Sequence, residues 1–203
     1  MKNTNWGIMK NRVIAEETKQ NSQPVGGIIP NDTLEVYFEK DVDTAPIAEL
    51  IKSLREKEKI SLSIAANYEI LPPPIKLYIT SYGGIIANGF AASDVIRTLK
   101  VPVHTIVMGC AASAATLISC VGTKRFIYKR SRILIHQLSG GAWGKFNEIK
   151  DDIKNLTQYH EMILDFYKEY TKVPEKQLDE VLSHDLWWNA KTALRYGLVD
   201  EIL

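Results

Sequence analysis

Two kinds of hydrophobic pattern alternate along the chain and predict a mixed α/β fold. Residues 33–39 and 75–80 alternate apolar and polar side chains, as strands with one exposed face do. Each is followed by apolar residues at helical spacing, after a capping Asp43 in the first case and over residues 87–99 in the second. Between these two units, residues 60–74 end in three prolines and are expected to form a loop.

The unit of a strand and a helix then repeats. Residues 103–107 predict a strand, residues 108–112 a tight turn, and residues 113–121 a helix of small and apolar side chains. Two short strands are expected at residues 125–128 and 132–136. Strands that alternate with helices form largely parallel sheets, whose functional loops gather at the carboxyl ends of the strands.

A long amphipathic helix is predicted over residues 145–171, after a glycine-rich stretch. Its apolar stripe either lies on the core of the same domain or projects and packs against a second subunit. Shorter helices are expected from Pro174 to Leu182 and between a capping Asn189 and Gly197. The members of the stripe recur at steps of three and four residues: Phe146, Ile149, Ile153, Leu156, His160, Ile163 and Tyr167.

Composition narrows the classes of function. A chain of 203 residues fits one domain, expected over residues 33–203, after a polar arm or loop over residues 1–32. Hydrophobic residues make up 45% and the net charge is +1, so no global field favours nucleic acid or an anionic membrane. The uncharged residues 101–123 contain a proline and many small polar side chains, and they predict a buried strand and helix rather than a membrane span.

The cysteines and the N-terminal residues point to a reducing compartment. Cys110 and Cys120 lie ten residues apart without the spacing of a metal site, so we expect reduced core thiols and no metal. No secretory signal pattern opens the chain, which predicts a cytoplasmic protein. Neither GxGxxG nor GxxxxGK[ST] occurs, and no nucleotide or other cofactor is expected to bind.

Ser113 is the candidate nucleophile. It follows a predicted strand in a run of glycine and alanine, and it opens a helix whose unpaired N–H groups could stabilise an oxyanion. A lone serine in such a place is more often a helix cap, so the hypothesis needs a base and a group that orients the base.

Four histidines and one aspartate bear on that hypothesis. His104 and His160 lie in an apolar strand and on the apolar stripe, which favours core or interface roles. His136 ends a buried strand at the sheet edge where Ser113 is also expected. Asp185, which follows His184 in a loop, either flanks a helix or orients the base. The Gly83–Gly84 turn could supply N–H groups to the other side of an oxyanion hole.

Together these segments resemble the Clp protease family, peptidase family S14, whose proteolytic subunit is ClpP. The resemblance is clear from residue 75 to residue 203 and extends more weakly from residue 33. Five motifs carry it: Ser81-Tyr82-Gly83-Gly84, Met108-Gly109-Cys110-Ala111-Ala112-Ser113, Lys124-Arg125-Phe126, Ser131-Arg132-Ile133-Leu134-Ile135-His136-Gln137, and Tyr196-Gly197-Leu198-Val199-Asp200.

The resemblance implies a role for each matched position. It places the nucleophile on Ser113, the general base on His136 and the orienting acid on Asp185. It places the oxyanion-hole N–H groups on Gly84 and Ala114. A strand that pairs with extended substrate would comprise Gln137, Leu138, Ser139, Gly140 and Gly141.

The resemblance also implies an architecture and partners. The fold would be a crotonase-like, ClpP-type spiral of repeated ββα units with a projecting handle strand and helix over residues 137–171. The activity would be serine endopeptidase cleavage of unfolded polypeptide, without a cofactor of its own. Two stacked seven-membered rings of this chain, a tetradecamer, would enclose the sites, and a partner AAA+ ATPase would unfold substrates and feed them in.

The sequence departs from the family pattern near the site without losing a member of the triad. Tyr82 stands where proline is usual, Cys110 where glutamine is usual, and Leu138 where proline is common. Ala114 and Ala115 replace a usual Met-Gly pair. These changes would reshape the substrate cleft.

Three other readings stay open at this point. The chain could be an inactive subunit that assembles with active ones, or an acyl-CoA enzyme of the crotonase type. It could also be a serine–lysine peptidase that uses Lys124, in which case activity would survive the loss of His136.

Overall fold

The computed structural model describes residues 34–203, so the prediction for residues 1–32 lies outside the described residues. Five parallel strands form the body of one sheet in the order β1-β2-β3-β4-β7, and β5 and β6 extend it beside the last residues of β3. β6 runs antiparallel to β5. The strands are β1 (Glu35–Phe38), β2 (Ile75–Ser81), β3 (Val103–Ala112), β4 (Lys124–Ile127), β5 (Arg132–Leu134), β6 (Trp188–Asn189) and β7 (Glu201–Ile202).

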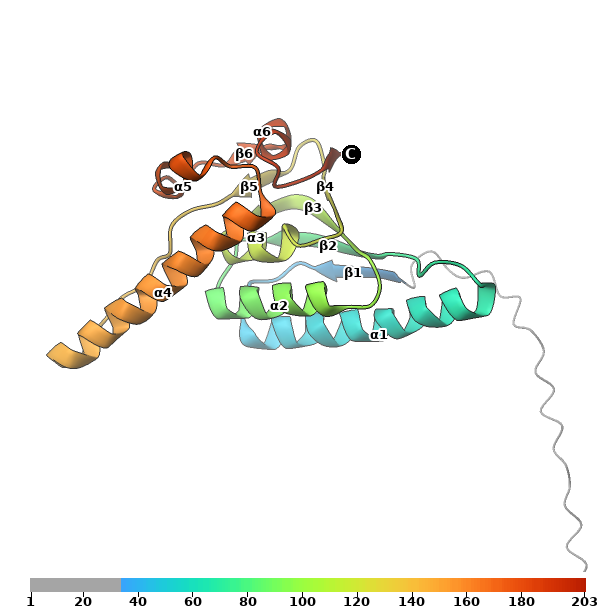
Figure 1. Ribbon diagram of the computed structural model, residues 1–203, viewed down its shortest axis with the longest axis horizontal. Coiled ribbons are helices and arrows are strands. Elements are labelled where there is room, and N and C mark those ends of the chain that lie inside the picture. The colour runs from blue at the N-terminus through green and yellow to red at the C-terminus, as the bar shows by residue number, and fades with distance from the viewer. Residues whose placement is uncertain (1–33) are drawn as a thin grey trace, which may run out of the picture.

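The helices gather on one face of this sheet and at its end. Figure 1 shows α1, α2 and α3 beneath the strands, while α4 runs from the sheet out beyond the body of the domain. The helices are α1 (Thr44–Tyr68), α2 (Ile86–Thr98), α3 (Ala114–Ser119), α4 (Phe146–Tyr170), α5 (Glu175–Leu182) and α6 (Ala190–Arg195). None of the helices within residues 34–203 is both long and apolar enough to cross a membrane.

Alternation along the strands places the core on the helix-covered face. In β2, Ile75, Leu77 and Ile79 are completely buried, whereas Lys76 and Tyr78 point to the other face and are more exposed. A strand buried on one side only gives this period of two. The alternating pattern that predicted β1 and β2 therefore also predicts which of their side chains are buried in the core.

The predicted loop over residues 60–74 is wrong for its first nine residues, which continue α1 to Tyr68. Polar side chains occupy the buried face there and hide the helical period. Glu58 accepts a hydrogen bond from the Lys100 N–H at 2.6 Å, and Ser61 donates to the Pro73 carbonyl at 2.7 Å. Buried polar groups are tolerated when they are hydrogen-bonded, so the helix continues where the sequence suggested solvent-exposed loop.

The predicted tight turn over residues 108–112 is also wrong, because β3 continues through it to Ala112. Gly109 adopts a φ of 79°, and the register between β2 and β3 shifts after Ile79. Beyond that irregularity, Cys110 to Ala112 pair with β5. Glycine at positive φ is typical of a bulge, which bends a strand without ending it.

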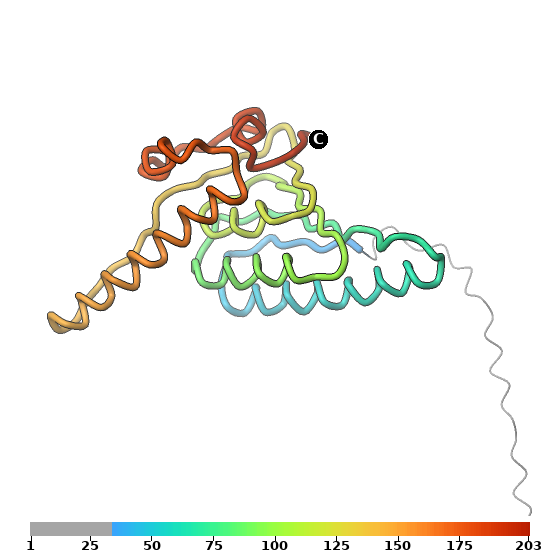
Figure 2. The backbone as a smooth tube through the Cα atoms, viewed as in Figure 1, coloured from blue at the N-terminus to red at the C-terminus, as the bar shows by residue number. Residues whose placement is uncertain are grey.

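The long predicted helix is present as α4, and its stripe lies on the core of the domain only toward the C-terminal end of the helix. Ile163, Phe166 and Tyr167 are buried on the domain, whereas Phe146 and Ile153 are 74% and 55% exposed. Residues 137–144 lead outward beside α4 to the start of this helix, which then returns to the domain (Figure 2). The two segments are close enough that a side chain at Gly140 would meet Leu156.

Residues 137–141, the expected substrate-pairing strand, carry no regular element. A strand is defined by a hydrogen-bonded neighbour, and among residues 34–203 the Gln137 N–H bonds instead to the carbonyl of Leu182 at 2.6 Å, at the end of α5.

The C-terminal predictions are confirmed: Asn189 caps α6 by accepting from the Thr192 N–H, and Gly197 follows the helix at a φ of 68°.

Candidate active site

Ser113 lies at the junction of β3 and α3 in an unusual backbone conformation. Its φ is 53° and its ψ is −129°, a combination that is costly for a residue with a side chain. Such strain persists only where the surroundings hold it, and it is concentrated at functional sites. The junction therefore presents Ser113 as a nucleophile would be presented, at the first turn of a helix.

The surroundings that hold Ser113 come from three parts of the chain. Its N–H donates to the carbonyl of Leu134 at 2.9 Å, and its own carbonyl accepts from the Thr116 N–H at 2.9 Å. The backbone of Gly83 packs so closely that an added Cβ would lie 2.7 Å from the Ser113 Cβ. Only glycine fits at that approach, which explains the first glycine of the Gly83–Gly84 turn.

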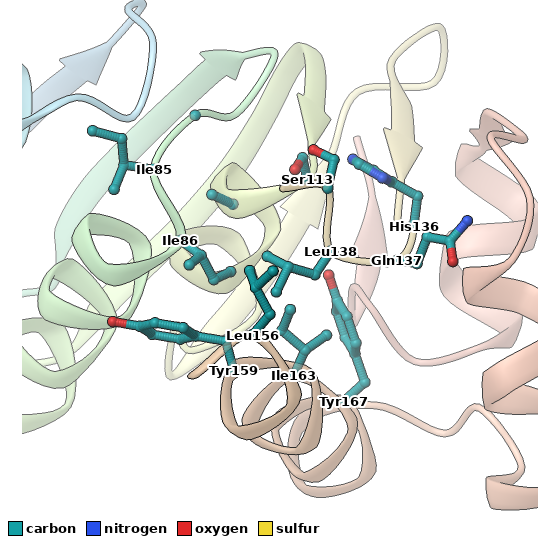
Figure 3. A pocket seen from close by; sticks show the side chains of 13 residues that line it. Ile85, Ile86, Ser113, His136, Gln137, Leu138, Leu156, Tyr159, Ile163 and Tyr167 are labelled. Atoms are coloured by element: carbon teal, nitrogen blue, oxygen red, sulfur yellow. The ribbon is translucent and has the colours of Figure 1, made fainter. Parts of the chain in front are cut away.

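His136 faces Ser113 across the mouth of a cavity. Both residues line this cavity, and Figure 3 shows the imidazole of His136, which follows β5, directed toward Ser113 at the end of β3. On its other side, the Nδ1 atom of His136 lies 3.6 Å from Oδ1 of Asp185. The Asp185 side chain is 81% exposed and that of His136 only 21%. Contacts of this kind are often long in the absence of substrate and tighten when it binds. The structure thus places Ser113 and His136 at one cavity and Asp185 behind His136.

Two backbone N–H groups are available at the same cavity. Val42 pairs with the Gly83 carbonyl and the Ile85 N–H, so this bridge does not use the N–H of Gly84. Ala114 is the first residue of α3, and its N–H has no acceptor within the helix. Both residues line the cavity beside Ser113, as the predicted oxyanion hole requires.

The cavity itself measures about 280 Å³ and lies under Ser113 and His136. Its walls are mainly apolar and come from α2, the segment after β5, and α4. Sequence reasoning did not identify these α4 residues as pocket-lining, although the apolar stripe contained most of them. The side chains shown there in Figure 3 are Ile86, Leu138, Leu156, Tyr159, Ile163 and Tyr167.

Two other candidate side chains, Lys124 and His160, do not line the cavity at Ser113. Lys124 pairs in register with His104, nine residues before Ser113 along β3, which is about 30 Å of strand. A serine–lysine pair between Ser113 and Lys124 is therefore excluded. His160 lines a neighbouring hollow with Leu156 and Thr157.

Both cysteines are free thiols. Burial raises the pKa of Cys110, and it raises the pKa of Cys120 to about 11. Neither thiol is activated as a nucleophile, since reactive cysteines have lowered pKa values. Cys120 is buried as predicted, whereas Cys110 is only half-buried beside Tyr82. Within residues 34–203, no cluster of three or more His, Cys, Asp or Glu side chains could hold a metal ion.

A strained serine and a histidine at one cavity, with a carboxylate 3.6 Å from the histidine, form the arrangement found in serine peptidases and related acyl-transfer enzymes. The comparison with family models gives the family itself. The Clp protease model matches residues 56–203, nearly three quarters of the chain. The chain belongs to the Clp protease family.

Individual relatives agree with this assignment. The ATP-dependent Clp protease proteolytic subunit 2 of Treponema denticola is 38% identical over 156 residues, 76% of this chain and 78% of that protein. The subunit of the same name from Thermobifida fusca is 36% identical over 131 residues, 64% of each chain. The aligned part thus spans somewhat less than two thirds of some relatives and more of others.

A solved structure shows the same fold. A point mutant of ClpP1 from Listeria monocytogenes superposes with a TM-score of 0.73 at 28% identity, covering 85% of this chain and 92% of that one. The predicted family and ClpP-type fold class are confirmed, and so is the enzyme class that the family carries, a peptidase.

Proposed function

We propose that this chain is the proteolytic subunit of a compartmentalised serine protease, with Ser113 as nucleophile, His136 as general base and Asp185 as orienting acid. The observation that carries the proposal is the strained Ser113 turn, which faces His136 while His136 Nδ1 lies 3.6 Å from Asp185 Oδ1. The proposed catalytic domain comprises residues 33–203, whose buried core runs from Val36 to Val199.

The proposed reaction is acyl transfer in two steps. His136 removes the Ser113 proton as Oγ attacks the peptide carbonyl carbon, and Asp185 stabilises the imidazolium that forms. The Gly84 and Ala114 N–H groups donate to the oxyanion, a contribution of about 3 to 4 kcal/mol per donor. When the peptide C–N bond breaks, His136 returns the proton to the leaving amine. Water, deprotonated by His136, then hydrolyses the ester on Ser113.

The substrate in this proposal is an extended segment of unfolded polypeptide. Residues 137–141 lie beside the triad without a strand partner among the described residues, and Gln137, Leu138 and Ser139 line the cavity. An extended peptide that pairs with them would place a side chain in the apolar cavity and its carbonyl at Ser113.

The assembly in this proposal is a pair of stacked seven-membered rings. The projecting part of α4 supports this assembly, because its exposed Phe146 and Ile153 could be buried only against an apolar surface of another subunit. An AAA+ ATPase would deliver substrates, since the relatives are named ATP-dependent and this chain carries no phosphate-binding loop motif. With two free thiols, the proposed compartment is a reducing cytoplasm.

Hydrolysis of a fluorogenic peptide by triad variants tests the proposal. Ser113→Ala and His136→Ala are expected to abolish turnover. Asp185→Asn is expected to lower kcat by about 10²- to 10⁴-fold, because the imidazole loses its orientation. All three should keep the oligomer and the melting temperature of the parent.

His184→Ala is the matched control, because His184 is an exposed histidine beside Asp185 that does not line the cavity. It is expected to keep full activity. Turnover by Ser113→Ala near the level of the parent protein would reject the proposal.

A further inference from the structure

A buried pair of hydroxyl groups connects α4 to the nucleophile turn. The hydroxyl of Tyr167 lies 2.6 Å from Oγ1 of Thr116, and that Oγ1 lies 2.6 Å from the carbonyl oxygen of Ser113. Thr116 is fully buried in α3 and Tyr167 is 2% exposed on α4. Figure 3 shows Tyr167 rising from α4 with its hydroxyl toward the Ser113 end of the cavity.

The direction of both hydrogen bonds follows from the atoms involved. A carbonyl oxygen can only accept, so Thr116 Oγ1 must donate its single proton to Ser113. The Thr116 oxygen is then an acceptor for Tyr167, which must be the donor of the second bond. The chain of donation runs from Tyr167 through Thr116 to Ser113.

The carbonyl at the end of this chain belongs to the peptide plane that carries the Ala114 N–H. A trans peptide is planar, with its N–H directed opposite to its C=O. When the Ser113 carbonyl is held by Thr116, the direction of the Ala114 N–H is therefore held as well. This N–H is one of the two donors proposed for the oxyanion.

We propose that Tyr167 is a positioning residue that acts through Thr116 to orient the oxyanion donor at Ala114. This inference rests on the proposed function, because it assigns Tyr167 to the peptidase reaction at Ser113. The ring of Tyr167 lines the cavity, but its hydroxyl touches neither reacting atom, and the effect of this hydroxyl passes through the Ser113–Ala114 peptide plane.

Two further observations fit this role. Burial raises the pKa of Tyr167 far above its usual value, so the phenol keeps the proton that it donates. The neighbouring Phe166 packs edge-on against Phe90 of α2 at 6.1 Å, which fixes this part of α4 on the domain. This packing holds the neighbouring Tyr167 in place against Thr116.

Single-hydroxyl variants test the proposal in the full-length assembled protein. Tyr167→Phe and Thr116→Val each remove one hydroxyl, and Thr116→Ser restores the hydroxyl without the methyl group. Tyr170→Phe is the control, a tyrosine one turn further along α4 that packs on Phe166 and Arg97. The readouts are kcat and KM for a fluorogenic peptide, the affinity for a peptide boronate that forms a tetrahedral adduct, and the melting temperature.

A positioning role predicts a loss confined to the transition state. Tyr167→Phe and Thr116→Val should each lower kcat and boronate affinity by about fivefold, the value of one neutral hydrogen bond, with KM unchanged. The double variant should lose no more than Thr116→Val alone, and Thr116→Ser and Tyr170→Phe should behave as the parent.

The contrary outcomes are distinguishable. Full kcat in Tyr167→Phe, or losses that multiply in the double variant, would overturn the role of Tyr167 and leave the peptidase proposal intact. Hydrolysis by the parent protein that does not depend on Ser113 would overturn the proposed function, and the role of Tyr167 with it.

Discussion

At the scale of single residues, Ser113 and Gly83 hold each other in conformations that few residues adopt. Ser113 has a φ of 53° and Gly83 a φ of 98°, and their backbones meet where the carboxyl ends of β2 and β3 lie side by side. The strain is local, and the hydrogen bonds of Ser113 to Leu134 and Thr116 counteract it. Changes at Gly83 should therefore act on the nucleophile directly.

Gly83→Ala tests this close approach. The added Cβ would lie 2.7 Å from both the Ala112 carbonyl oxygen and the Ser113 Cβ, so the turn must move. We expect a loss of about a hundredfold in the rate of peptide hydrolysis, since a misplacement of about 1 Å has that effect. Strain at the positive φ should also lower the free energy of unfolding by about 1 to 3 kcal/mol.

Urea denaturation measures the second effect, with Gly141→Ala as its stability control. A side chain at Gly141 meets nothing within 4 Å, so that variant should unfold like the parent. A Gly83→Ala protein with unchanged activity would show that the close approach is not needed.

The three residues of the proposed triad could be predicted from the sequence, but the hydrogen bonds that hold the Ser113 turn could not. Ser113, His136 and Asp185 stand at strand ends and in a loop, where chemistry gathers in α/β folds. The link between Thr116 and Tyr167 joins residues 51 positions apart. In the sequence Tyr167 is only one member of an apolar stripe, and nothing local shows which hydroxyl it will meet.

At the scale of elements, a bidentate ion pair adds to the backbone hydrogen bonds that join the edge strand β7 to β4. Arg125 donates from Nε and Nη2 to Asp200 at 3.0 Å and 2.5 Å, and from Nη1 to the carbonyl of Tyr170 at 2.6 Å. These bonds join two strands and the end of α4. Side-chain hydrogen bonds from Arg125 lower the pKa of Asp200 and, with the charge of Arg125, outweigh burial, which raises it.

The lowered pKa makes this contribution depend on pH. A carboxyl group with a depressed pKa in the folded state stabilises fully above its unfolded pKa of about 3.9, and the stabilisation is lost as the pH falls through the folded value. We expect Asp200→Asn to cost about 1 kcal/mol at pH 7, the upper value for a partly exposed pair, and little near pH 2.

Urea denaturation of parent and variant at several pH values measures this difference. The control is Glu201→Gln, which changes the adjacent exposed carboxylate in β7. A difference that stays constant from pH 7 to pH 2 would contradict the assignment to the Asp200 charge.

The order of the elements could be predicted, whereas two boundaries could not. The end of α1 and the length of β3 depend on partners distant in sequence: Pro73 and Lys100 for the buried polar face of α1, and β5 for the last residues of β3. Local patterns of solvent-facing residues and glycine suggested a loop and a turn at these places. Hydrogen bonds to residues distant in sequence keep the first segment helical and the second in a strand.

At the scale of the whole molecule, the described chain leaves an apolar surface without a partner of its own. The first turns of α4 expose Phe146 and Ile153, and Trp143 just before them is 98% exposed. Figure 1 shows this part of α4 extending beyond the rest of the domain. In the proposed double ring, this surface would lie between subunits and hold the rings together.

Ile153→Glu tests that arrangement by native mass spectrometry. A charge in a buried apolar contact costs several kcal/mol for each copy, so the variant should dissociate into single rings or smaller species. Its melting temperature as a separate subunit should change little, because Ile153 is 55% exposed on the domain. The control Asp152→Glu keeps the charge of an adjacent α4 residue. A variant that stays a complete double ring would place the ring contact elsewhere.

In the proposed function, Ser113 is a nucleophile that His136 activates. The most direct measurement treats the parent protein, Ser113→Ala and His136→Ala with a fluorophosphonate and locates the adduct by mass spectrometry. We expect one adduct per chain, on Ser113, and we expect either substitution to abolish it. Absence of labelling in the assembled parent protein, or labelling of another residue that persists in both variants, would contradict it.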